Sequence, residues 1–219
     1  MNFKFSTVQR AGYRQTPNSL KILQAAKRVF IRDGSGKFSS RGVAKEAGAS
    51  LGAVQHFFPA KHDLLAAMLE YVVNEYESAY GKLCEQLPMN GETRLLGVID
   101  ILITDIWKKD TRKFFFGFWE LACHNPTAGR LLDEMYVFHV NRLGAFIGAA
   151  RPALSQVRCE ELGMQTAALI EGLMLFSAPR ARPLATRARM SRMVKESVLR
   201  LLTEDRRAAT SAKPSARAA

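Results

Sequence analysis

The segment from Ser39 to Phe58 constrains the fold of this chain more than any other part of the sequence. It predicts a short helix with Ser39 as its N-cap and its end at Ala47. The small apolar face of this helix lets a neighbouring helix approach closely. Gly48 can then adopt a left-handed turn without steric cost. A second short helix follows up to Phe58, with Val54 one turn earlier on the same apolar side. This is the design of a helix-turn-helix, and a helix fits a DNA major groove about 12 Å wide.

The rest of the chain also reads as helix. Apolar residues recur at helical spacing, prolines and glycines separate the segments, and no run alternates in the manner of a strand. We expect an all-α fold. Residues 1–17 read as a flexible basic arm and residues 205–219, rich in Ala, Ser, Arg and Pro, as a disordered tail. The helices in between are expected at residues 19–34, 39–47, 51–58, 61–87, 92–109, 111–124, 127–150, 156–177 and 186–204.

Positive charge is concentrated at the two ends of the chain. The formal net charge is +12, and residues 1–65 hold 11 Lys and Arg against 3 Asp and Glu, whereas residues 66–179 hold 10 against 14. A basic first segment around a helix-turn-helix favours a polyanion as its partner. The alternative from charge alone is a basic surface that serves only solubility.

Several functional classes find no support in the sequence. The apolar stretch 95–107 is interrupted by Gly97, Asp100 and Asp105 and is shorter than a membrane span of about 20 residues. No leader peptide precedes the first helix, so a cytoplasmic protein without a membrane partner is expected. Three scattered cysteines and four histidines show no metal-ligand spacing, and no catalytic motif is present. We therefore predict no metal, no cofactor and no enzymatic activity.

Four linked segments resemble the TetR family of bacterial regulators. They are Ile22 to Phe30 (ILQAAKRVF), Val43 to Ser50 (VAKEAGAS), Gly52 to Phe58 (GAVQHFF) and Pro59 to Leu65 (PAKHDLL). The resemblance implies that residues 18–65 form a three-helix DNA-binding domain. It implies that residues 66–204 form a helical domain for ligand binding and dimerisation. Ile170 to Leu173, followed by a basic last helix, is similar to the family's dimerisation segment.

Residues for DNA contact follow from this arrangement. Ser39, at a helix N-terminus, can bond a phosphate, and the resemblance implies a phosphate contact for Lys61. Arg41 and Lys45 are further candidates for the DNA backbone. Gln55 can bond an adenine edge, and Leu51 or Ala53 can touch a thymine methyl. The remaining predicted DNA-binding residues are Ser50, His56 and Phe57, and for His56 a structural or phosphate-bonding role is the favoured interpretation.

Two positions depart from the pattern common in the family. Phe57 has no hydroxyl to donate to phosphate, and Leu51 stands where a polar or basic residue is common. Base recognition here is therefore expected to lean on methyl contacts and DNA shape.

Aromatic residues are concentrated in the second part of the chain, with a few polar groups among them. An ordinary helical core explains most of them, but the resemblance implies a pocket for a largely apolar small-molecule inducer. The residues predicted to line it are Trp107, Phe115, Phe118, Trp119, His124, Tyr136, His139 and Met174.

Two apolar stripes near the end of the chain predict a homodimer interface, although such stripes also describe plain core. Leu169, Leu173 and Phe176 form one, and Met190, Val194, Val198 and Leu201 form the other. A two-fold dimer would require a near-palindromic operator in double-stranded DNA. The function predicted is a ligand-released repressor. The alternatives are an activator of the same family and a nonspecific architectural DNA-binding protein.

Overall fold

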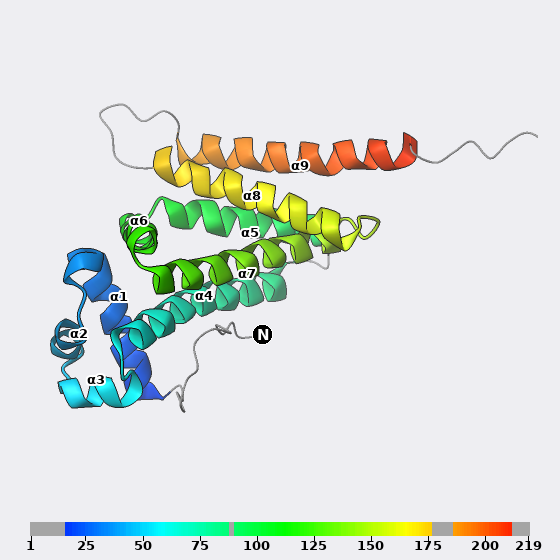
Figure 1. Cartoon of the computed structure of the whole chain (residues 1–219). Helices are drawn as coiled ribbons and strands as arrows, with labels where there is room; N and C mark the ends of the chain where they lie inside the picture. Colours follow the sequence, from blue (N-terminus) through cyan, green and yellow to red (C-terminus); the bar gives the residue numbers. More distant parts are fainter. Residues whose placement is uncertain (1–15, 88–89, 177–185, 212–219) are drawn as a thin grey trace, which may run out of the picture. The chain divides into compact units, whose positions relative to one another are not determined.

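The structure is a computed structural model that describes residues 16–87, 90–176 and 186–211, with side chains described up to Thr203. Within these ranges the chain forms nine α-helices and no strand, as the sequence predicted (Figure 1). Their bounds are α1 Pro17–Lys37, α2 Ser40–Ala47, α3 Leu51–Phe57, α4 Lys61–Gln86, α5 Gly91–Ile106, α6 Lys109–His124, α7 Pro126–Ala150, α8 Gln156–Phe176 and α9 Arg187–Ser211.

The described chain divides into two compact units, and neither is continuous in sequence. The first contains the described residues up to Lys82 together with Lys108–His139, and the second contains Leu83–Trp107 together with the described residues from Val140 onward. The boundary expected at residue 65 falls inside the continuous helix α4. Helix α6 belongs with the first three helices because it packs on α1, a long-range pairing that local sequence patterns do not encode.

An aromatic cluster joins α6 to α1 in the first unit. Phe30 of α1 lies with its ring centroid 5.5 Å from that of Phe114 and 5.6 Å from that of Phe118, both on α6. Gly117 lies on α6 between Phe114 and Phe118, and a Cβ built there would come within 3.2 Å of the Phe30 ring. The absence of a side chain at Gly117 therefore lets the two helices approach closely.

The second unit is built from α5, α8 and α9, which pack against one another (Figure 1), together with the C-terminal half of α7. Gly144 of α7 and Gly163 of α8 allow a close crossing, since a Cβ built on Gly163 would lie 2.6 Å from the carbonyl oxygen of Val140. Asp100 of α5 accepts hydrogen bonds from Ser191 and Lys195, both on α9. These contacts fix which sides of α8 and α9 face inward.

The first helix begins earlier than predicted. The sequence predicts a start at residue 19, but the N-cap is Thr16. The Thr16 hydroxyl oxygen accepts from the Ser19 backbone N–H, and the Ser19 hydroxyl oxygen accepts from the Thr16 N–H. Pro17 occupies the first helical position, where no N–H is needed. Pro17 therefore belongs to α1 and Thr16 caps it, although both fall within the predicted arm, and residues 1–15 lie outside the described residues.

The last helix ends later than predicted. Helix α9 continues to Ser211, so the tail expected to be disordered from residue 205 is helical as far as residue 211. Alanine and arginine are strong helix formers, and this stretch is rich in both. Residues 212–219 lie outside the described residues.

Candidate nucleic-acid interface

Two capping hydrogen bonds and one left-handed turn shape the helix-turn-helix. Ser39 caps α2 by accepting from the Gly42 N–H at 3.2 Å, and Ser50 caps α3 by accepting from the Ala53 N–H at 3.1 Å. Between them, Gly48 adopts φ 61° and ψ 37°, the left-handed conformation that favours glycine. The turn predicted at Gly48 and the cap predicted at Ser39 are both confirmed.

The inner sides of α2 and α3 are fully packed. Val43, Val54 and Phe58 are buried, with Ala44 and Ala47 beside them. This burial holds α3 against α2 and α1 and leaves one side of α3 outward. On that outer side Gln55 and His56 are exposed, and Leu51, Ala53 and Phe57 are half-buried.

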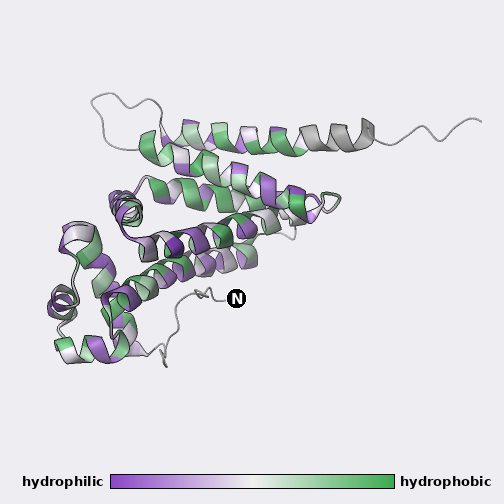
Figure 2. Cartoon of the chain, viewed as in Figure 1, coloured by the Kyte–Doolittle hydropathy of each residue, from purple (hydrophilic) through white to green (hydrophobic). Residues whose placement is uncertain are grey.

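The outer side of α3 is only partly polar, as the sequence indicated (Figure 2). Phe57 stacks edge-on against His56 with ring centroids 5.2 Å apart and also contacts Phe58. The Phe57 ring is thus held by its aromatic neighbours and offers apolar surface. The side-chain amide of Gln55 offers both a hydrogen-bond donor and an acceptor on this side.

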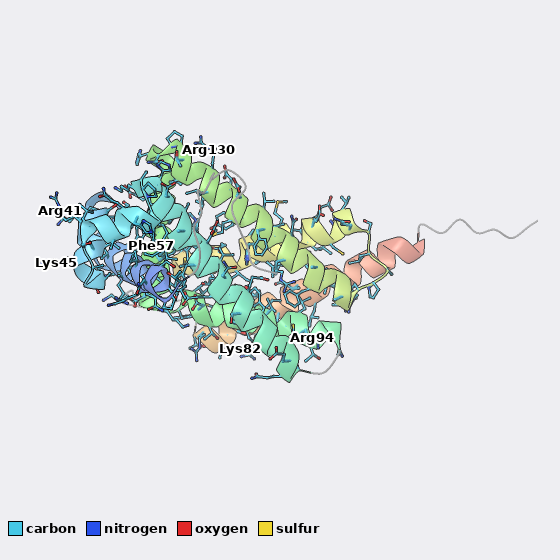
Figure 3. The ribbon with its side chains drawn as sticks, turned by 90° about the horizontal axis from the view of Figure 1, so that it is seen from below. Arg41, Lys45, Phe57, Lys82, Arg94 and Arg130 are labelled. Atoms are coloured by element: carbon cyan, nitrogen blue, oxygen red, sulfur yellow. The ribbon has the colours of Figure 1, made fainter. Side chains whose placement is uncertain are left out.

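Unpaired positive charge lies next to α3. Arg41 and Lys45 are exposed on α2, and Figure 3 shows both projecting outward from the same side of this helix. Neither makes an ion pair within the described residues. The Ser39 hydroxyl oxygen accepts from Gly42, so its hydrogen remains available to a phosphate oxygen.

Lys61 extends this charge from the first turn of α4. The Ala60 N–H donates to Asp63 at 2.9 Å, which sets the start of the helix and hence the position of Lys61. The Lys61 Nζ lies 6.0 Å from the centre of the Phe38 ring, and the residue is exposed. Because Phe38 is buried, the packed core fixes the ring beneath this ammonium group.

Other cations nearby are already neutralised. Glu46 of α2 binds Arg28 at 2.9 Å and Arg32 at 2.6 Å, both on α1. These two guanidinium groups hold the pKa of the Glu46 carboxyl below its usual value, so it stays ionised and links α2 to α1. Arg32 also pairs with Asp33. Arg28 and Arg32 therefore serve the packing of the helix-turn-helix, whereas Arg41, Lys45 and Lys61 face outward.

Comparison with known proteins agrees with this geometry. Residues 22–68 match the family model described as bacterial regulatory proteins of the tetR family, and residues 92–203 match the model of the BetI-type transcriptional repressor C-terminal domain. The second match alone covers half of the chain. The chain belongs to the TetR family of bacterial regulatory proteins. It is accordingly a DNA-binding transcriptional regulator and not an enzyme.

Individual relatives within the TetR family are distant. The HTH-type transcriptional regulator BetI of Escherichia coli O17:K52:H18 (strain UMN026 / ExPEC) is 28% identical over 144 residues, which cover 65% of this chain and 72% of BetI. A putative transcriptional regulator from Pseudomonas aeruginosa PAO1 superposes with a TM-score of 0.71 at 20% identity, covering 87% of this chain and 93% of that one. A putative regulator from Saccharomonospora viridis, solved in complex with choline, gives a TM-score of 0.65 at 18% identity, covering 84% and 97%.

The predicted ligand-pocket residues of the first unit have diverse environments. Trp119 donates from its indole N–H to the Tyr136 hydroxyl at 2.7 Å. His139 is partly exposed as a residue, but its Nε2 is out of contact with solvent and has no hydrogen-bond partner among the described residues. Burial lowers the pKa of His139 to about 4, so the ring is neutral at physiological pH.

Three other predicted pocket residues of this unit have less support. Phe118 is completely buried in the aromatic cluster between α1 and α6, and Phe115 packs edge-on against Phe114 with ring centroids 5.4 Å apart. Both are explained by core packing. His124 is exposed as the last residue of α6, where the helix ends, so it does not line a buried pocket.

The second unit contains the two remaining predicted pocket residues and one that the prediction missed. Met174 is buried and Trp107 half-buried. Glu171, one turn before Met174 on α8, has a carboxylate Oε2 without solvent contact and without a hydrogen-bond partner among the described residues. Its sequence signal was its isolation, since Glu171 is the single charged residue between Leu162 and Phe176.

The structure corrects one of the two apolar stripes predicted to form the dimer interface, the stripe on α9. Met190, Val194 and Val198 are buried within the chain itself, at 4%, 4% and 1% exposure, so their side chains are not available to a second copy. They form, with Leu202, the inner stripe of α9, which packs on α5 and α8. Leu201 is half-buried. A helical apolar stripe marks a covered face, but it does not reveal whether the chain or a partner covers it.

The other predicted stripe is open. On α8, Leu169 and Phe176 are exposed and Leu173 is half-buried. Further large apolar side chains are exposed nearby in the same unit: Val157, Met164 and Leu175 on α8 and Met193 on α9. The sequence prediction did not include these four residues. For the three on α8, apolar residues recur on several sides of the helix, so no single stripe stands out.

Two classes of site find no support in the described part of the chain. No cluster of His, Cys, Asp and Glu there is arranged to hold a metal ion. Every described helix is too short or too polar to serve as a membrane span.

Proposed function

We propose that this chain is a homodimeric repressor that binds a near-palindromic operator through α2, α3 and the start of α4. The observation that carries the proposal is the arrangement around α3. Its outward side presents Gln55 and apolar groups for base contact. The exposed cations Arg41 and Lys45 lie on the preceding helix, and the exposed Lys61 starts the following one. Base-reading groups on a short helix with phosphate-binding groups beside it are the division of labour found in specific DNA recognition.

The homodimer in this proposal rests on the exposed apolar side chains of α8 and α9. Exposed apolar patches on a soluble domain mark surfaces that another molecule covers. A second copy of the chain would present the same patch, which a two-fold symmetric interface requires. Two reading helices would then face two half-sites about 34–36 Å apart, or a multiple of this spacing.

Release by a small molecule completes the proposal. TetR family regulators bind small molecules as well as DNA. One of the predicted pocket residues, His139, has a buried Nε2 without a hydrogen-bond partner among the described residues. Such an atom is costly to bury unless a ligand or an ordered water satisfies it. A ligand would act only through its difference in affinity for the DNA-bound and free conformations.

Footprinting on the DNA upstream of the chain's own gene tests the regulator. We expect protection of one near-palindrome, with an affinity at least about 1,000-fold above that for scrambled DNA of the same length and composition. Equal affinity for both DNAs would instead support an architectural DNA-binding protein. Transcription from the protected promoter in a purified system then distinguishes a repressor, which lowers the transcript level, from an activator, which raises it.

A further inference from the structure

The open side of α8 has small residues at its middle. Ala168 is exposed, and a Cβ built on Gly172 would meet nothing within 4 Å. The exposed apolar Met164 lies one turn from Ala168, and the exposed Leu169 lies one turn from Gly172. A glycine inside a helix is unfavourable relative to alanine, and no packing among the described residues explains Gly172. This side of α8 therefore suits the close approach of another helix.

Charged residues are segregated between the first turns of α8 and the first turns of α9. Residues 156–161 of α8 contain one Arg and two Glu, for a net charge of −1, and Glu161 is exposed. Residues 187–192 of α9 contain three arginines, for a net charge of +3, and Arg187, Arg189 and Arg192 are all exposed. None of the three arginines makes an ion pair within the described residues.

These two charged segments lie far apart within one chain. Helices α8 and α9 lie side by side and run in opposite directions, so α9 begins beside the end of α8 (Figure 1). From Glu161 to Phe176, the last residue of α8, the distance is about 22 Å at a rise of 1.5 Å per residue. This exceeds the screening length of about 10 Å at 0.1 M salt. The arginines are therefore not compensated by the first turns of α8 in their own chain.

A two-fold axis can pair two copies of α8 in two ways. If the axis runs along α8, the two helices are parallel, and the arginines of both copies gather at one end. If the axis is perpendicular to α8 and passes near Ala168, the helices are antiparallel, and the start of α8 in each copy lies beside the start of α9 in the other. Repulsion between like charges opposes the first arrangement, and attraction between opposite charges favours the second.

We propose that α8 pairs antiparallel with α8 of a second copy, and that Glu161 faces the partner's Arg189 and the partner's Arg192 at each end of the interface. This inference rests on the proposed homodimer and specifies its register. The small and apolar residues supply the close contact, and the charged ends select the register and disfavour chains without the matching pattern. The Glu161 Oε2 accepts from Arg158 of the same helix at 2.7 Å, which leaves Oε1 for the partner.

Charge reversal tests these contacts in the full-length protein. Sedimentation velocity at 50 mM salt gives the dimer dissociation constant of wild type, of Glu161→Arg, of Arg189→Glu/Arg192→Glu, and of the combination of all three substitutions. We expect each partial reversal to raise the dissociation constant at least about tenfold, since it places like charges opposite each other at both ends of the interface. The combination should return the constant to within about threefold of wild type.

The design separates the proposed contacts from the effect of net charge. Glu161→Arg makes the chain more basic and Arg189→Glu/Arg192→Glu makes it more acidic, so net charge does not explain a weakening shared by both. Arg200→Glu, two turns beyond Arg192 on the same helix, is the matched control and should not weaken the dimer. Unchanged constants in both partial reversals, or no recovery in the combination, would overturn the proposal.

Disulfide crosslinking measures the register directly. In a Cys123→Ser background, which removes the exposed native thiol, we expect Ala168→Cys to link to its own copy, since a disulfide needs Cα atoms within about 7 Å. Val157→Cys should not link, because its two copies would lie about 33 Å apart along antiparallel helices. Efficient linking at Val157→Cys would establish parallel helices and refute the register, even if a charge-reversal variant did not fold.

Failure of this inference and failure of the proposed function have different signatures. A dimer whose dissociation constant is unchanged in both partial reversals would retain the homodimer and contradict its register. A chain that stays monomeric at micromolar concentrations and protects a single half-site would contradict both.

Discussion

Replacement of Lys61 by alanine gives a quantitative test of the DNA-binding geometry. Lys61 is exposed at the first turn of α4, beside the outward side of α3, and we assign it one phosphate contact per protomer. Neutralising one phosphate changes the slope of log affinity against log salt concentration by about 0.9. A dimer loses two contacts, so the slope of Lys61→Ala should be shallower by about 1.8.

This slope translates into an affinity difference that is easy to measure. Between 50 and 200 mM salt, wild-type protein should lose about tenfold more affinity than Lys61→Ala, and it should do so on operator and on random DNA alike. Fluorescence anisotropy with a labelled duplex at four or five salt concentrations gives both slopes.

Lys82→Ala is the matched control for Lys61→Ala. Lys82 is exposed near the other end of the same helix (Figure 3), and its substitution removes the same charge. At a rise of about 1.5 Å per residue it lies roughly 30 Å along the helix from Lys61, well beyond the screening length of about 10 Å at 0.1 M salt. Its slope should equal that of wild type.

The contact between Lys61 and the Phe38 ring needs its own control. Loss of this contact costs about 0.5–1 kcal/mol of stability at an exposed site. Thermal unfolding of the variant should therefore change little, and Lys61→Arg should restore the slope. If Lys61→Ala and wild-type protein show the same salt slope, the phosphate assignment is wrong.

Four further outcomes follow from the structure. Gln55→Ala should cost about 1–3 kcal/mol on the operator and relax preference at one base pair, measured with a set of singly substituted operators. Gly48→Ala forces a Cβ into the left-handed region and should cost about 1–2 kcal/mol in urea unfolding, whereas Gly81→Ala, at an exposed helical position with open space, should be neutral or stabilising. Phe176→Ser should shift the light-scattering mass from dimer towards monomer; an unchanged dimer would contradict a role for this part of α8. Burial raises the pKa of Glu171 to about 7 in the folded chain, so its stabilising contribution is present at low pH and is lost as pH rises from about 4.5 through 7. The free energy of unfolding in urea, measured relative to Glu171→Gln, should therefore fall by at most about 3 kcal/mol between pH 5 and pH 8.

The ligand-pocket prediction shows where sequence reasoning stops. The concentration of aromatic residues with polar groups among them pointed to Phe118 and His124. Phe118 instead packs in the core against α1, and His124 is exposed at the end of α6. Glu171 was not among the predicted pocket residues, because the segment from Ile170 to Leu173 was assigned to dimerisation by its resemblance to the family. Only the packing of α8 shows that its carboxylate oxygen is out of contact with water.

The helix-turn-helix could be predicted from local sequence signals alone. Its cap at Ser39 and its turn at Gly48 depend on hydrogen bonds and backbone angles that involve residues no more than four positions apart. Such signals are complete within a short stretch of chain, so pattern reading recovers them. The same holds for the all-α class, because each helix carries its own apolar spacing and its own breaks.

What covers each apolar face could be read only from the packed helices. Met190, Val194 and Val198 form a stripe as clear as any in the sequence, but α5 and α8 of the same chain cover it, and the open apolar side chains lie largely on α8. The placement of α6 against α1 through Phe30 and Gly117 is likewise a pairing of residues far apart in sequence. Burial depends on every element packed around a residue, and periodicity reports only which residues share a side.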